Sequence, residues 1–174
     1  IGGLGGTSLE LDTQRSNDYE IGLMNNYNKF SSNISTYLID GKNELAYDSD
    51  AFQNINMNST RRYGFEISIK NKIIDYATLI SDLTYSKAKY TSENQGTYAT
   101  DFKDNDVPLV PEYSIDTRLE INLSDFTTFT PSLKYQDDMR MESDDENFQD
   151  TKIPSQFLFD ISISSKINKI LSAN

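Results

Sequence analysis

The densest group of ionisable side chains lies between residues 136 and 150, in the stretch QDDMRMESDDENFQD. Clustered carboxylates supply the oxygen ligands that Ca²⁺ takes in sets of about six to eight. Asp144, Asp145 and Glu146 are the candidate metal ligands. The run has neither the glycine nor the regular spacing of an EF-hand loop, so a solvated acidic loop is the competing interpretation.

The composition removes most catalytic chemistry. The 174 residues include no histidine and no cysteine. This excludes Ser-His and Cys-His pairs, imidazole metal ligands, zinc-thiolate sites and disulfides. We therefore expect no enzyme, no catalytic residue and no cofactor; a carboxylate pair in a cleft would be the remaining route to catalysis. The net charge of −11 argues against a nucleic-acid partner.

Three side chains in predicted loops are candidates for ligand contact. Tyr98 and Phe102 lie in a polar stretch, and an aromatic side chain at a loop tip can grip a ligand. Packing within the loop is the alternative for both. Arg140 has the charge to meet an anionic metal chelate, although pairing with a neighbouring carboxylate is the alternative.

The elements that must position these loops are β-strands. In the stretch STRRYGFEISIKNKIIDY (59–76), apolar and polar residues alternate, which is typical of a strand with two unlike faces. Similar alternation recurs along the chain. It predicts strands at 18–27, 33–47, 55–70, 77–90, 113–123, 127–136 and 157–165, and an eighth that begins near Ile170.

The alternation defines two rows of side chains with opposite character. The apolar row contains Tyr63, Phe65, Ile67, Ile69, Ile115, Leu119 and Ile121, and the polar row contains Arg62, Glu66, Lys70, Asp116, Arg118 and Glu120. A soluble sandwich would bury the apolar row, whereas a membrane barrel would turn it to lipid and leave the polar row in a wet lumen. The strand pattern alone is compatible with both folds.

The lengths of the connections favour the barrel. Short turns near 28–31, 71–76, 124–126 and 166–169 alternate with long loops near 48–54, 91–112 and 137–156. In an up-and-down meander, alternate connections fall at the same end, and outer-membrane barrels have tight turns at one end and long loops at the other. No stretch approaches the roughly 18 apolar residues of a membrane-spanning helix.

Aromatic residues near the predicted strand ends suit the two interfacial girdles of such a barrel. These residues are Tyr19, Tyr27, Tyr47, Tyr63, Tyr90, Tyr113, Tyr135 and Phe157.

Several stretches resemble the barrel of TonB-dependent outer-membrane receptors. LELDTQRSNDYEIGL (9–23) is similar to a segment that recurs in that family, and further similar segments follow in the family's usual order. They are STYLIDGKNEL (35–45), NINMNSTRRYGFEISI (54–69), LTYSKAKY (83–90), DVPLVPEYSIDTRLEI (106–121) and FLFDISISSKINKILS (157–172).

The resemblance implies a piece of the C-terminal half of a 22-stranded barrel, whose lumen is plugged by an N-terminal domain. The family imports iron-siderophores, haem, cobalamin or other scarce ligands with energy coupled through TonB. Outer-membrane lipid, a plug domain, the remaining barrel strands, TonB and a small-molecule or metal-chelate ligand are the implied partners. Because no plug, TonB box or closing strand is recognisable, we expect a fragment or a split chain.

We therefore predict an all-β antiparallel up-and-down meander of about seven to eight strands, part of a transmembrane β-barrel. Residues 1–174 would form one partial barrel domain, with a leading loop at 1–17 and strands from 18 to 174. The expected function is import of a scarce ligand at the outer membrane of a Gram-negative bacterium. The alternative is a soluble secreted or surface β-sandwich that binds as an adhesin or carbohydrate-binding module.

Overall fold

The computed structural model describes residues 11–48, 52–56, 58–91, 102–142, 144–148, 150, 152–166 and 172–173. Within these ranges the chain is built from β-strands and turns. No helix in this part of the chain is long and apolar enough to cross a membrane. The strands are β1 (Arg15–Tyr27), β2 (Phe30–Lys42), β3 (Leu45–Asp48), β4 (Gln53–Asn56), β5 (Thr60–Ile74), β6 (Ala77–Tyr90), β7 (Tyr113–Asn122), β8 (Thr127–Gln136), β9 (Met139–Arg140), β10 (Lys152–Ile153), β11 (Gln156–Lys166) and β12 (Ser172–Ala173).

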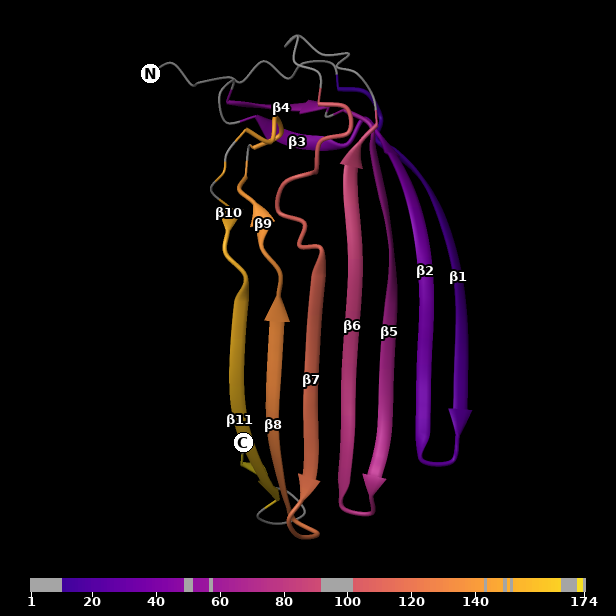
Figure 1. Ribbon diagram of the computed structural model, residues 1–174, viewed down its shortest axis with the longest axis vertical. Helices are drawn as coiled ribbons and strands as arrows, with labels where there is room; N and C mark the ends of the chain where they lie inside the picture. The colour runs from indigo at the N-terminus through magenta and orange to yellow at the C-terminus, as the bar shows by residue number, and fades with distance from the viewer. Residues whose placement is uncertain are drawn as a thin grey trace.

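Eight strands form one antiparallel sheet in the order β1-β2-β5-β6-β7-β8-β11-β12. Figure 1 shows the long strands side by side in a single layer, each running opposite to its neighbour. The other four strands form two small hairpins, β3–β4 and β9–β10. The predicted all-β meander is confirmed, and no second sheet packs on it to make a sandwich within the described ranges.

The connections are sorted by length between the two ends of the sheet, as predicted. Tight turns join β1 to β2, β5 to β6 and β7 to β8 at one end, and the long connections lie at the other (Figure 1). Asn28 adopts a positive φ of 51° in the β1–β2 turn, a conformation that asparagine tolerates. Beside the β5–β6 turn, hydrogen bonds from Lys29 and Lys72 hold the pKa of the exposed Asp75 carboxyl below its usual value.

Several strand boundaries differ from the prediction. The strand predicted at 55–70 is observed as β5 (Thr60–Ile74), and β2 begins at Phe30 instead of residue 33. β1 begins at Arg15, so the leading segment is three residues shorter than the expected 1–17. The strand predicted at 33–47 is broken at Asn43, which has a φ of 53°, and the chain then enters the β3–β4 hairpin. The long loop predicted near 48–54 therefore contains the hairpin turn. The sequence GKN, rich in turn-forming residues, carried the signal for this break.

Pro131 interrupts the pairing of β8 with β7. The register is continuous on the β11 side, where Ile161 is opposite Pro131. On the β7 side no pair forms at Leu119 or Glu120. Proline has no N–H to donate to a ladder, which accounts for the gap on one side of the strand only.

The register places the two predicted rows on opposite faces of the sheet. Directly opposed residues of antiparallel strands project to the same face. Phe65 is opposite Thr36 and Tyr85, and Glu66 is opposite Ser35 and Thr84. Followed from strand to strand, one face carries Tyr63, Phe65, Ile67, Ile69, Ile115, Leu119 and Ile121, and the other carries Arg62, Glu66, Lys70, Asp116, Arg118 and Glu120.

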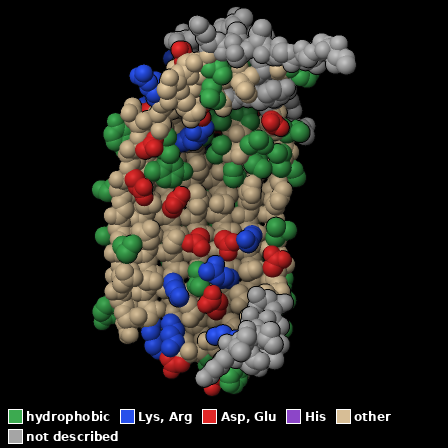
Figure 2. Space-filling model, turned by 180° about the vertical axis from the view of Figure 1, so that it is seen from behind, with side chains coloured by type: hydrophobic (Ala, Val, Ile, Leu, Met, Phe, Trp, Pro, Cys, Tyr) green, Lys and Arg blue, Asp and Glu red, His purple; other side chains and the backbone are tan. Residues whose placement is uncertain are grey.

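Neither face resembles the core of a soluble protein. Ile21 on β1 and Phe159 on β11 belong to the apolar face and are 73% and 60% exposed. Figure 2 shows charged side chains gathered over the middle and lower part of the opposite face. The hydrophobic cluster of buried residues, Ala88, Tyr90 and Val107, lies at the long-loop end.

Candidate functional site: the loop end of the polar face

The long-loop end is organised around the last residues of β5 and β6. Thr60 begins β5 and is paired in register with Tyr90, which ends β6. Each of these residues is only 1% exposed. Their parity places both on the polar face, together with Arg62 and Ala88. The neighbouring loops are therefore attached to the sheet at this buried pair of residues.

The connection between β2 and β5 is held to this point by Glu44. Its carboxylate accepts two hydrogen bonds from Arg62, at 3.0 and 2.7 Å, and a third from the hydroxyl of Thr60. The Glu44 side chain is 13% exposed, and a bidentate guanidinium pair at such a site is strong and directional. Arg62, a charged residue of the polar face, is thus paired with Glu44.

The β6–β7 connection folds back over the end of β6. The amide of Val107 donates to the carbonyl of Ala88 at 3.0 Å, and the amide of Tyr90 donates to the carbonyl of Asn105 at 3.0 Å. Phe102 packs on the Tyr90 ring with centroids 5.6 Å apart. Hydrophobic packing and strand-like hydrogen bonds together attach this loop to the sheet.

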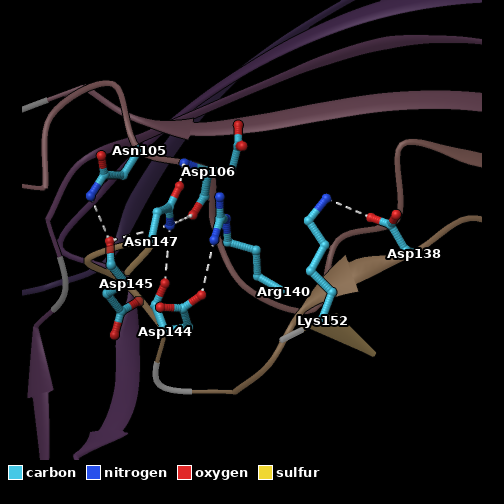
Figure 3. A network of polar contacts seen from close by, with 8 residues as sticks. All are labelled: Asn105, Asp106, Asp138, Arg140, Asp144, Asp145, Asn147 and Lys152. Carbon is cyan, nitrogen blue, oxygen red and sulfur yellow. Dashed lines mark hydrogen bonds and ion pairs between the residues drawn. The ribbon is translucent and has the colours of Figure 1, made fainter. Parts of the chain in front are cut away.

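The β8–β11 connection is attached to Tyr90 and to the β6–β7 connection, and Figure 3 shows its bonds to Asn105 and Asp106. The Tyr90 hydroxyl donates to the Asp145 carboxylate, and the Asn105 side chain donates to the Asp145 carbonyl at 2.9 Å. Asn147 accepts from the amide of Asp106 at 2.8 Å and donates to the Asp106 carbonyl at 3.0 Å. The Asn147 side chain therefore satisfies both backbone groups of one residue in the other loop, as a paired strand would.

An ion pair within the β8–β11 connection completes the network. Arg140 lies 3.1 Å from the Asp144 carboxylate, whose side chain is 2% exposed. A separate, exposed pair joins Lys152 to Asp138 at 2.7 Å (Figure 3). The amide of Leu109 donates to the Arg140 carbonyl at 3.1 Å, which is a further link between the two connections.

The candidate ligand and metal residues are placed as follows. Tyr98 lies outside the described residues. Phe102 packs against Tyr90, and Arg140 pairs with Asp144, so both adopt the alternative arrangements stated above. Asp144 and Asp145 point into the network (Figure 3) and Glu146 is exposed. Among the described residues, no group of three or more acidic side chains is arranged to hold a metal ion.

Tyr37 and Gly64 make a second contact on the polar face. The Tyr37 ring lies over Gly64, and its hydroxyl donates to Ser86 on β6 at 2.9 Å. Tyr37 thereby reaches across β5 from β2. Because Gly64 has no side chain, the Tyr37 ring can occupy the space above it.

Aromatic residues mark the loop end of the apolar face. Phe65 stacks on Tyr85 at 5.4 Å, and Tyr85 lies 5.1 Å from Tyr113. The prediction that Tyr90 joins this girdle was wrong, because Tyr90 is buried on the opposite face. Its even position in β6, which it shares with the polar residues Thr84 and Ser86, was the signal in the sequence.

The cavities of the sheet differ at its two ends. A cavity of about 80 Å³ at the loop end is lined by residues that include Lys87, Val107, Glu112 and Arg140, and this volume is far below the roughly 300–1,000 Å³ of a ligand pocket. At the tight-turn end, a hollow of about 630 Å³ is lined by residues that include Lys70.

Comparison with known proteins identifies the family. The family model "TonB dependent receptor-like, beta-barrel" matches residues 2–174. No curated protein matches the chain.

Many solved structures share the fold, among them the following three. The ferric yersiniabactin uptake receptor FyuA from Yersinia pestis is 12% identical, with a TM-score of 0.72 over 91% of this chain and 23% of that one. The ferric-catecholate import receptor Fiu from E. coli K12 is 17% identical, with a TM-score of 0.65 over 97% and 24%. The FrpB iron transporter from Neisseria meningitidis is 14% identical, with a TM-score of 0.67 over 90% and 25%.

The chain thus spans about a quarter of the length of these solved structures. Its single antiparallel meander, with sorted connections and two unlike faces, has the form of one sector of their barrels. The family is one of transport receptors of the Gram-negative outer membrane. The family model matches nearly the whole length of this chain. The chain therefore belongs to the β-barrel family of TonB-dependent receptors.

Proposed function

We propose that the chain is part of a receptor that imports a scarce ligand across the outer membrane, such as a ferric siderophore, haem or cobalamin. The observation that carries this proposal is the elaborated end of the sheet. Three long connections converge there on Thr60 and Tyr90, at the loop end of the polar face. Loops held over one mouth of a barrel are suited to capture a ligand from outside.

The two faces receive different surroundings in this proposal. Tyr63, Phe65, Ile67, Ile69, Ile115, Leu119 and Ile121 would contact outer-membrane lipid. Arg62, Glu66, Lys70, Asp116, Arg118 and Glu120 would line the lumen. Ion pairs such as Lys134–Asp116, at 3.0 Å, suit a wet lumen that a plug domain enters. The remaining strands of the barrel would pair with the outer edges of β1 and β12, the first and last strands of the described sheet, and TonB would act through a plug segment.

The chemical class of the ligand is proposed by analogy with the similar solved structures. FyuA and Fiu are described as receptors for ferric yersiniabactin and ferric catecholates, and FrpB as an iron transporter. These descriptions support a metal chelate as the ligand of this receptor. No step of covalent catalysis is assigned to the chain.

An uptake experiment in the native host tests the proposal. The full-length receptor gene is deleted, and accumulation is measured for radiolabelled ferric catecholate, ferric hydroxamate, haem and cobalamin. We expect accumulation of one of these ligands to fall to the level seen in a strain that lacks TonB, and to return on complementation. Unchanged accumulation of all four ligands in the deletion strain would contradict the proposal.

A further inference from the structure

Two of the long connections contact each other at the loop end of the sheet. Loop A comprises residues 102–112, between β6 and β7, and loop B comprises residues 137–142 and 144–148, between β8 and β11. In the barrel these loops are separated by the β7–β8 hairpin along the chain. We propose that loops A and B form one mechanical unit, that Asn147 is the positioning residue that joins them, and that Tyr90 anchors the unit to the barrel wall.

The Asn147 side chain joins loop B to loop A. Its side-chain amide makes reciprocal hydrogen bonds with the backbone of Asp106, at 2.8 and 3.0 Å, and donates at 3.0 Å to the Asp144 carbonyl. It thus binds both loops at once. Its backbone φ of 55° lies in the left-handed region, which asparagine tolerates better than most residues. Both the side chain and the backbone of this position therefore favour asparagine.

Tyr90 anchors both loops to the end of β6. The Tyr90 hydroxyl donates to Asp145 in loop B, while the Tyr90 backbone bonds Asn105 and Asp104 in loop A. One buried residue at the end of β6 therefore contacts both loops. Since Tyr90 is packed against Val107 and Phe102, its position is fixed by the hydrophobic cluster as well as by these bonds.

The consequence is that displacement of one loop requires displacement of the other. Separating them breaks the two bonds between Asn147 and Asp106, the Asn105–Asp145 bond and the Leu109–Arg140 bond together. Contacts that form and break together behave as one cooperative unit. Phe148, 81% exposed and adjacent to Asn147, is carried by this unit.

Spin-label distances in the full-length receptor test the inference. Lys103→Cys in loop A and Glu142→Cys in loop B, both at exposed positions, are labelled in a receptor otherwise free of cysteine. The distance distribution is measured in outer-membrane vesicles without ligand. We expect one narrow distribution, because the loops are joined.

Asn147→Gly is the decisive variant because glycine accepts the positive φ of this position, while its lack of a side chain removes the hydrogen bonds to Asp106 and Asp144. We expect the single narrow distribution to be lost. The matched control is Asn28→Gly, which makes the same substitution at a φ of 51° in the β1–β2 turn, and should leave the distribution narrow. A broad distribution in the wild type, or a narrow one in Asn147→Gly, would overturn the inference.

A milder variant covers the case in which Asn147→Gly prevents assembly. Tyr90→Phe keeps the buried ring and removes only the hydrogen bond to Asp145. It should broaden the distribution between the loops, and an unchanged distribution would overturn the role of Tyr90. Because the readout needs no ligand, its outcome is independent of whether the receptor imports a metal chelate.

Discussion

Replacing Ile67 with arginine is expected to be the most damaging single change in the sheet. Ile67 lies on the apolar face, opposite Ile34 and Leu83, between the aromatic residue Phe65 and Ile69. If this face contacts lipid, an arginine near the middle of the bilayer costs about 2–4 kcal/mol. We expect the Ile67→Arg receptor to assemble poorly, seen as loss of the folded, heat-modifiable band in cold gel electrophoresis of outer membranes.

Ser68→Arg is the matched control for this change. Ser68 is the next residue of β5, but it belongs to the polar face and lies opposite Asn33 and Asp82. An arginine there enters the proposed wet lumen beside a carboxylate, so the folded band should be retained. Equal loss of the folded band in both variants would show that the two faces do not differ in their surroundings.

Replacing Gly64 with alanine is expected to destabilise the barrel through overlap with the backbone. A Cβ at this position would overlap the carbonyl oxygen of Tyr85 and would lie 2.8 Å from the Tyr37 hydroxyl. Overpacking of this kind costs about 1–3 kcal/mol. The Tyr37–Ser86 hydrogen bond would also be displaced. We expect a lower urea midpoint for unfolding of the Gly64→Ala receptor in vesicles.

The control for this second prediction is Gly22→Ala on the same face. A Cβ at Gly22 would meet its nearest atoms at 3.5 Å, which is ordinary contact distance. Its urea midpoint should stay close to that of the wild type. A fall of similar size in both variants would mean that loss of glycine itself, and not the overlap at Gly64, determines the effect.

The faces of the sheet were predictable where the alternation was regular. In β5 and β7, apolar and polar residues alternate over most of the strand, and a period of two fixes the face of every side chain. The prediction was less clear in β2, because Tyr37 and Ile39 share the polar face while Ile34 and Leu38 lie on the apolar one. Gly64, the register partner of Tyr37 on β5, leaves the space that the Tyr37 ring occupies.

The loop network could not be predicted from local pattern. Tyr90 and Asp145 are 55 residues apart, and Asp106 and Asn147 are 41 apart. Their meeting depends on the register of four strands. The sequence did mark loop residues with aromatic and charged side chains, but Phe102 and Arg140 proved to hold the loops together. Glu44 was missed because it was assigned to the interior of a strand.

Solvent access to the two faces, measured in the native outer membrane, tests the central claim most directly. Single cysteines replace Phe65, Leu119, Glu66 and Glu120 in turn, in a full-length receptor otherwise free of cysteine. Each is probed with a lipid-phase label and with a water-soluble thiol reagent. We predict lipid labelling at Phe65 and Leu119 and aqueous labelling at Glu66 and Glu120. Resistance of Phe65 and Leu119 to both reagents would place them in a dry protein core and would contradict the account.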